Sequence, residues 1–243
     1  TPGEAEALTP MSTSRSGRVA DVWVGVRPLE TGRPEVRVTW EPAPVLPDGV
    51  PGPQAMTVEL LDRESGTPIG APVELVSALG VVTEGALAAF GLPGTEASLR
   101  FTVLGPEQAV LDRWTQAVEV PGEAEGALPV STLEFRRARS VVELRALRAA
   151  PQAAPSASRR FVRTDRVRVE TAVAGTFDSV TATAELLNKA GERLTPLACE
   201  VMEGRVALEL PLTSLVASTY LVRVRVGAGG RIAEQVAAFE MAR

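Results

Sequence analysis

Apolar and polar residues alternate along most of this 243-residue chain, in short segments separated by glycine and proline. Val36-Arg37-Val38-Thr39-Trp40 is one such segment, and the loop at 42–54 that follows it contains five prolines and two glycines. A period of two is typical of a half-buried strand, and proline is excluded from helix interiors and central strands. The pattern therefore predicts an all-β fold.

The same pattern places the individual elements. The expected strands lie at 19–26, 36–40, 56–62, 73–77, 81–90, 98–104 and 111–120, and then at 128–135, 161–172, 179–188, 194–202, 205–210, 219–226 and 231–241. Residues 140–150 space apolar residues at three-residue intervals and predict the chain's one amphipathic helix. Many short strands at this spacing predict two antiparallel β-sandwich domains in tandem, of the immunoglobulin or fibronectin-III type.

Composition and charge suggest where these domains begin and end. The expected organisation is a flexible N-terminal arm at 1–16, a first sandwich at 17–121, an acidic linker at 122–127, and a second sandwich at 128–243 with the helix near 140–150. Residues 1–127 carry 8 arginines against 18 acidic residues, a net charge of −10, whereas residues 128–243 carry 17 basic against 12 acidic residues, a net charge of +5. A chain with two such halves can orient on a partner or on a copy of itself.

The chain contains no histidine, one lysine and one cysteine, Cys199. Histidine is the commonest general acid or base and a common metal ligand, so its absence argues against most triads, zinc sites and haem ligation. Cys199 lies in an apolar, strand-like segment, which predicts a buried and unreactive thiol. We therefore expect no catalytic residue, no metal site and no cofactor. The three tryptophans, Trp23, Trp40 and Trp114, lie within strand patterns and are expected in the cores.

Arginines gather at the start of the second half. The residues expected to bind a partner are Arg136, Arg137, Arg139, Arg145, Arg148, Arg159, Arg160 and Arg163. Such a basic face suits an acidic protein surface, and lipid headgroups or nucleic acid are further alternatives. Nucleic acid is disfavoured because stacking aromatic residues do not interleave with the arginines. In the competing interpretation, Arg166 and Arg168 line a solvated strand face and the other arginines pair with carboxylates such as Glu143 and Asp165.

Several segments resemble a known family. Gly17–Gly25 and Val38–Pro44 resemble the region that follows the von Willebrand A domain in the VWFA-related exported proteins of Acidobacteria and Gemmatimonadetes. In the second half the similar segments, in order, are 143–147, 160–167, 186–191, 210–215 and 219–221. The A domain and its Asp-x-Ser-x-Ser metal motif are missing from this chain, so the resemblance implies no metal site. It implies tandem sandwich domains exported to the periplasm or cell surface after removal of a signal that this sequence does not contain.

Together these features predict a non-catalytic, exported structural and interaction subunit. It would dock onto a larger, membrane-associated protein assembly and stabilise it, using the arginine-rich face of the second domain and the acidic face of the first, with no membrane span of its own. A carbohydrate-binding or adhesion module is the main alternative, and it predicts exposed aromatic residues on one sheet face. A hydrolase would need convergent polar residues in a pocket between the domains. Docking through a free sheet edge stays open as well.

Overall fold

The structure is a computed structural model that describes residues 18–28, 34–76, 88–91, 97–118, 127–150 and 153–242. Within these residues the predicted all-β fold is confirmed: four sheets carry the chain, with one α-helix and two short 3-10 turns. The predicted arm at 1–16, most of the predicted linker at 122–127 and most of the predicted strand at 81–90 lie outside the described residues. The division into domains at 122–127 stays a prediction.

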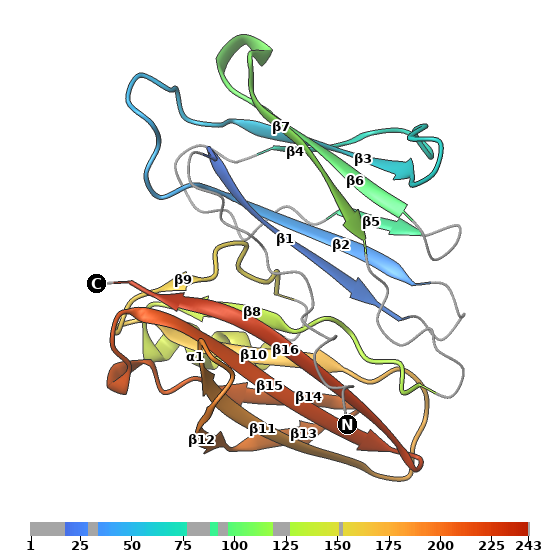
Figure 1. Ribbon diagram of the computed structural model, residues 1–243, viewed down its shortest axis with the longest axis vertical. Helices are drawn as coiled ribbons and strands as arrows, with labels where there is room; N and C mark the ends of the chain where they lie inside the picture. The colour runs from blue at the N-terminus through green and yellow to red at the C-terminus, as the bar shows by residue number, and fades with distance from the viewer. Residues whose placement is uncertain are drawn as a thin grey trace.

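The N-terminal unit, which we define as residues 18–118, contains two antiparallel sheets (Figure 1). One has the order β1-β2-β5, with β1 at Ala20–Arg27, β2 at Glu35–Pro42 and β5 at Ala88–Gly91. The other has the order β4-β3-β6-β7, with β4 at Val73–Val76, β3 at Ala55–Asp62, β6 at Ala97–Leu104 and β7 at Val110–Val118. The turn η1 (Pro106–Gln108) joins β6 to β7.

Side chains of both sheets enclose the core of the N-terminal unit. Val36, Val38 and Phe101 are inaccessible to solvent, and Trp40 is buried among them as the sequence predicts. Trp114 is half-buried and stacks on Phe101, with ring centroids 4.9 Å apart. This arrangement follows from the alternation in β2, because every second residue of the strand points into the sandwich.

The C-terminal unit, which we define as residues 127–242, also contains two sheets. The four-stranded sheet has the order β13-β14-β10-β8, with β13 at Cys199–Met202, β14 at Arg205–Glu209, β10 at Arg166–Ala172 and β8 at Glu134–Ala138. The five-stranded sheet has the order β12-β11-β15-β16-β9, with β12 at Arg193–Leu197, β11 at Val180–Asn188, β15 at Ser218–Ala228, β16 at Arg231–Met241 and β9 at Arg160–Phe161. The short turn η2 spans Leu212–Ser214. All neighbouring strands are antiparallel except β9 and β16, which run parallel.

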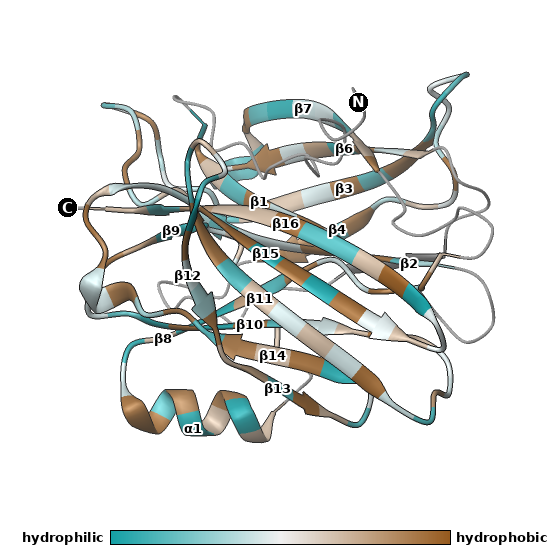
Figure 2. Ribbon diagram, turned by 60° about the horizontal axis from the view of Figure 1, so that its bottom comes forward, coloured by the Kyte–Doolittle hydropathy of each residue, from teal (hydrophilic) through white to brown (hydrophobic). Residues whose placement is uncertain are grey.

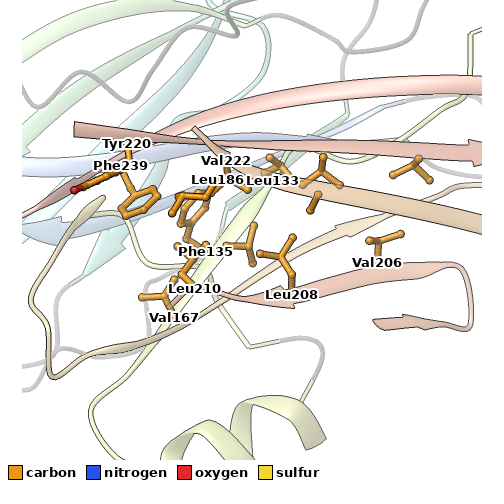
Figure 3. Close-up of a cluster of buried hydrophobic side chains, with 14 of the residues drawn as sticks. Leu133, Phe135, Val167, Leu186, Val206, Leu208, Leu210, Tyr220, Val222 and Phe239 are labelled. Carbon is orange, nitrogen blue, oxygen red and sulfur yellow. The ribbon is translucent and has the colours of Figure 1, made fainter. Parts of the chain in front are cut away.

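A second core lies between these two sheets (Figure 3). Phe135, Val167 and Leu208 point inward from the four-stranded sheet, and Val222 and Phe239 point inward from the five-stranded sheet. The sandwich is filled mainly by aliphatic side chains with a few rings. The opposite face of the four-stranded sheet is consequently free to carry the polar residues that alternate with the core residues.

The helix α1 (Val141–Ala149) confirms the predicted helix at 140–150. Its N-terminus is capped from both sides: the Ser140 hydroxyl accepts from the Glu143 amide at 3.1 Å, and the Glu143 carboxylate accepts from the Arg139 amide at 2.6 Å. The first bond satisfies an amide that the first helical turn leaves without a partner, and the second ties the residue before the N-cap to the helix. The helix packs against β8 and β10, and Figure 2 shows it along the outer side of the four-stranded sheet. Leu144 is its buried contact.

Three predicted strands have different bounds in the structure. The strand expected at 128–135 begins only at Glu134, because residues 127–133 instead follow the end of β10 through the single bridge between Val130 and Val173. The strand expected at 194–202 is divided at Ala198 into β12 and β13, which belong to different sheets. The strand expected at 161–172 is interrupted by a turn at 162–165, where the Asp165 carboxylate accepts from the Val162 amide at 2.9 Å.

Candidate functional site

The outer face of β1 and β2 turns toward the C-terminal unit. Val22, Val24 and Val26 pack on the core of the N-terminal unit, so the alternate residues of β1 point the other way. Trp23 is one of these residues, and it is only 2% exposed although it belongs to neither core cluster. A Cβ at Gly25 would lie 2.2 Å from the Trp23 ring, so only glycine leaves room for the indole. In Figure 1 the blue strands β1 and β2 lie between the other sheet of their unit and the C-terminal unit.

Three polar contacts join the units along this face, which we call the seam. Val26 and Thr132 exchange two hydrogen bonds of 2.9 Å, one through the Thr132 hydroxyl and one through its amide. The Arg37 guanidinium pairs with the Glu134 carboxylate at 2.5 Å. The seam therefore fixes β1 and β2 to the segment that leads into β8.

The third contact involves Glu41, whose carboxylate accepts from the Ala157 amide at 2.9 Å. Burial raises the pKa of Glu41 above its ordinary value of 4.5, and the positive charge of Arg137 and the amide hydrogen bonds only partly oppose this shift. The seam thus holds a carboxyl group that is more easily protonated than an exposed one.

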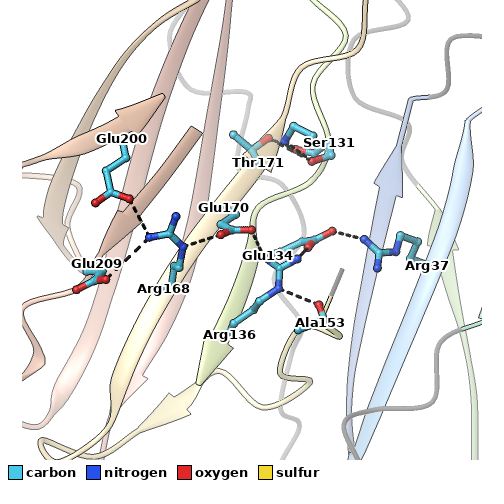
Figure 4. Close-up of polar contacts among 11 residues, drawn as sticks. Arg37, Ser131, Glu134, Arg136, Ala153, Arg168, Glu170, Thr171, Glu200 and Glu209 are labelled. Atoms are coloured by element: carbon cyan, nitrogen blue, oxygen red, sulfur yellow. Dashed lines mark hydrogen bonds and ion pairs between the residues drawn. The ribbon is translucent and has the colours of Figure 1, made fainter. Parts of the chain in front are cut away.

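A continuous row of charges crosses the outer face of the four-stranded sheet and ends at the seam (Figure 4). From the seam outward, the members of this charge row are Arg37, Glu134, Arg136, Glu170, Arg168, Glu200 and Glu209. Opposite signs alternate as far as Arg168, which pairs with both Glu200 and Glu209, so each buried charge lies beside at least one counter-charge. Such pairing is what allows ionised groups to remain away from water.

Strand pairing places these charges side by side. In the register of β8 and β10, Glu134 lies opposite Glu170 and Arg136 lies opposite Arg168. Arg136 donates to both Glu134 and Glu170, and its Nε donates to the Ala153 carbonyl at 2.8 Å. Diagonal pairing thus separates the two carboxylates that would otherwise repel each other across the strands.

The row is buried at its seam end and exposed at its outer end. Arg37, Arg136 and Arg168 are at most 4% exposed, whereas the Glu200 and Glu209 side chains are 55% and 37% exposed. Burial alone would lower the pKa of Arg168, but hydrogen bonds to Glu170 and Glu200 outweigh it, and the net effect raises that pKa. Arg168 thus keeps its charge inside the fold.

The structure corrects the prediction that Arg136 faces a partner. Its side chain is 1% exposed because it fills the space between two buried carboxylates. Arg168, expected on a solvated strand face, is likewise buried and paired. The expectation failed because part of the cover comes from the N-terminal unit, whose Arg37 is 97 residues from Glu134, and the rest from the way α1 folds back on β8 and β10.

Arg159 also turns inward. Its guanidinium lies 3.8 Å from the centroid of the Phe135 ring, and Nη2 donates to the Leu133 carbonyl at 3.1 Å. Burial lowers the pKa of Arg159 to about 9, against the opposing effect of Glu134, so the side chain keeps its charge at neutral pH. Arg159 is thus a packing residue rather than a surface cation.

Three of the predicted arginines are paired nearer the surface. Arg148 pairs with Glu209 at 2.5 Å, Arg160 lies 3.6 Å from Glu240, and Arg137 lies 3.9 Å from Asp165. The last pair is one that the competing interpretation anticipated. These arginines are half-buried or exposed, but their charges are partly neutralised within the chain.

The other three predicted arginines, together with Arg166, lie on the surface at one end of the C-terminal unit. Arg139, Arg145, Arg163 and Arg166 are exposed, and within the described residues none of them forms an ion pair with a carboxylate. Four exposed valines accompany them: Val141, Val142, Val162 and Val216, whose exposed fractions run from 39% to 73%. We call these eight residues the end patch.

Pairings within the fold hold the segments of the end patch together. Ala138, next to Arg139, pairs with Arg166 across β8 and β10. Arg163 donates through Nε to the Leu215 carbonyl at 3.0 Å, next to Val216. The end patch therefore combines positive charge with apolar surface. Reasoning from the sequence found three of its arginines but missed the valines, which lie at the start of α1, in the turn after β9 and after η2.

The acidic side chains and Cys199 do not cluster as metal ligands do among the described residues. No group of three or more histidine, cysteine, aspartate or glutamate residues among them is placed to hold a metal ion. Cys199 is half-buried rather than fully buried, and burial raises the pKa of its thiol, which disfavours the reactive thiolate. No helix within the described ranges is long and apolar enough to cross a membrane.

Comparison with known proteins gives likeness of fold only. No family model matches the sequence, and no curated protein matches it. The BSP domain structure of a biofilm-associated protein aligns with 92% of this chain at 10% identity and a TM-score of 0.40, and this chain spans 30% of that one. The fibronectin(III)-like modules of CbhA from Clostridium thermocellum align with 86% of this chain and 87% of theirs, at 10% identity and a TM-score of 0.25.

Proposed function

We propose that this chain is a non-catalytic, exported structural and interaction module that docks onto a larger, membrane-associated protein assembly at the periplasmic or cell-surface side. The end patch is the observation on which the proposal rests. It presents four arginines without ion pairs among the described residues, next to four exposed valines. Interfaces between proteins combine arginine with apolar surface in this way, whereas lone solvated charges do not need apolar neighbours.

The seam supports the structural part of the proposal. Two sandwiches joined only by a flexible linker would move independently. Here three contacts connect them. Arg37 and Glu134 form a buried ion pair, the Glu41 carboxylate accepts from the Ala157 amide, and Val26 forms hydrogen bonds with Thr132. A module of this kind would hold its two ends at a fixed separation, which suits a subunit that stabilises an assembly.

A carbohydrate-binding or adhesion role is less well supported. Such a module presents aromatic rings to sugars, but Trp23 and Trp40 are 2% and 3% exposed. Trp114 is half-buried between the Phe101 ring and the Arg18 guanidinium, which lies 3.8 Å from its ring centroid. The aromatic side chains whose burial the structure describes are all buried or half-buried.

Docking through the acidic face of the first domain stays a prediction. Asp48, Glu64, Glu74 and Glu107 are exposed in the N-terminal unit, but they lie in separate loops and strands. They could steer the chain electrostatically without forming a defined contact.

Co-purification from the native membranes tests the proposal. The chain would be isolated in mild detergent at low and raised salt, and bound proteins identified by mass spectrometry. The test variant is R139Q/R145Q/R163Q/R166Q, and the matched control is R63Q/R113Q/R193Q/R225Q, which removes the same charge from exposed arginines elsewhere.

We expect a stoichiometric protein partner with the wild type and the control, and its loss with the test variant and at raised salt. Equal retention by both variants would contradict docking through the end patch. A free monomer at every salt concentration would contradict the function itself. If the chain bound anionic lipid vesicles and no protein partner were found, the partner of the end patch would be a lipid surface rather than a protein.

A further inference from the structure

A groove of about 490 Å³ lies where the two units meet, at the far end of β10 from the end patch. The end of β1 contributes Arg27, and the turn that follows β10 contributes Gly175 and Phe177. The hairpin turn between β13 and β14 adds Glu203 and Gly204. The volume is in the range of sites that hold small molecules or short peptide segments.

Among the described residues that line the groove, Arg27 carries a positive charge and the exposed Glu203 carries a negative one. Arg27 is half-buried, and no carboxylate within the described ranges forms an ion pair with it. Behind it lies a cavity of about 10 Å³ that also borders Arg37 and Arg205. The carboxylates of that cavity, Glu134 and Glu170, are already held by Arg37, Arg136 and Arg168 of the charge row. An anionic group entering the groove would therefore meet the guanidinium of Arg27, which the buried carboxylates do not neutralise.

Phe177 lines the groove with an aromatic ring. Phe177 is half-buried between two glycines: a Cβ at Gly175 or Gly229 would lie 3.3 or 3.2 Å from its ring. The guanidinium of Arg231 lies over the Phe177 ring in a cation-π contact, 5.5 Å from the ring centroid. Val180 lines the groove beside it. This wall offers an apolar surface whose position is set before any ligand binds, which lowers the entropic cost of binding.

We infer that the groove binds a peptide segment in which an acidic side chain is followed by an apolar or aromatic one. The carboxylate would pair with Arg27, and the apolar side chain would pack on Phe177. Because residues of both units line the groove, such a ligand would also connect them across the seam. This site is independent of the proposed docking through the end patch, since β10 separates the two.

The inference can be tested by titrating the 15N-labelled chain with N-acetyl-Asp-Phe-amide and following backbone amide shifts. We expect saturable shifts at the amides of Gly175 and Gly204. N-acetyl-Asn-Phe-amide, which lacks the charge, should bind about tenfold more weakly. The variant R27Q should lose affinity for the Asp peptide to the same degree, while R63Q, at an exposed arginine of the same unit, should not.

Absence of saturable shifts in the wild type would overturn the inference. So would shifts that are unchanged in R27Q, or that centre on the end patch instead of the groove. The spectrum of ligand-free R27Q serves as the folding control. The variant F177L keeps an apolar wall but removes the ring, so it should lower the affinity for the Asp-Phe peptide without abolishing the shifts. Loss of the docking partner in the co-purification experiment would leave this result unaffected.

Discussion

The arginines of the charge row and those of the end patch lie a few residues apart in sequence but in opposite environments. Arg136 is 1% exposed and touches two carboxylates, whereas Arg139 is exposed and has no ion pair among the described residues. The difference shows that a dense run of one charge can serve two purposes in the same fold. One set joins elements inside the chain, and the other stays at the surface without ion pairs among the described residues.

The two regions should respond differently to substitution. A buried charge has lost its hydration, so removing its counter-charge leaves an uncompensated cost. An exposed arginine keeps its hydration and contributes little to folding stability. Four experiments, from the largest expected effect to the smallest, test this contrast.

Removing the centre of the charge row should have the largest effect. Arg136→Met deprives Glu134 and Glu170 of a shared partner and should lower the free energy of unfolding by about 3–5 kcal/mol. Chemical denaturation measures the change. Arg193→Met removes an arginine whose side chain is 60% exposed and pairs with Glu185, and it should cost less than about 1 kcal/mol. An equal loss in the free energy of unfolding for the two variants would contradict a larger contribution of the buried charge row to stability.

The pair across the seam should show strong coupling. A double-mutant cycle of Arg37→Met and Glu134→Gln should give an interaction energy of about 1–3 kcal/mol, because both side chains are less than a tenth exposed. The pair of Arg160 and Glu240, each about half exposed, is the control and should couple by less than about 1 kcal/mol. If the seam coupling were no larger than the control, the two units would not be joined by this contact.

The pH dependence of the seam should follow Glu41. Its pKa is raised in the folded state, so its contribution to stability is fully present below the unfolded value of 4.5 and is lost as pH rises through the folded value. Glu41→Gln keeps an acceptor for the Ala157 amide but cannot ionise. The variant should therefore gain stability relative to the wild type as pH rises from 4 through the raised pKa, by on the order of 1 kcal/mol or less. A difference that is independent of pH would contradict the ionisation of a buried Glu41.

Substitutions in the end patch should have the smallest effect on folding. The variant R139Q/R145Q/R163Q/R166Q should unfold within about 0.5 kcal/mol of the wild type per substitution, because these side chains are exposed and lack ion pairs within the described residues. Thermal and chemical unfolding measure this. A large loss would place these arginines inside the fold and remove the basis for their role in docking.

The local pattern predicted much of the fold. Alternation placed β3, β6, β11 and β16 within one or two residues, since each has one face on a core. The helix was predictable because its apolar spacing differs from that of the strands. The break at Ala198 was not, because β12 and β13 alternate in the same way and differ only in which sheet accepts them.

The candidate sites were less predictable than the fold. The sequence showed that arginines gather near β8, but it could not show which face of β8 is covered. That depends on Arg37, which pairs with Glu134 from 97 residues away, and on α1. Trp23 illustrates the same difficulty: it is buried as predicted, but at the seam rather than in the core that contains Trp40. The groove beside Arg27 had no signal in the sequence, since its walls come from separate turns.

The seam also has a consequence for synthesis, because the N-terminal unit leaves the ribosome first. Until the C-terminal unit is complete, Trp23, Arg37 and Glu41 have nothing to cover them. A large indole on the open face of a sheet is then available to other nascent chains, and Arg37 lacks the carboxylate that neutralises it. We therefore expect a partly made chain to need chaperones until Glu134 and the segment at 153–158, which hold the partners of Arg37 and Glu41, have emerged.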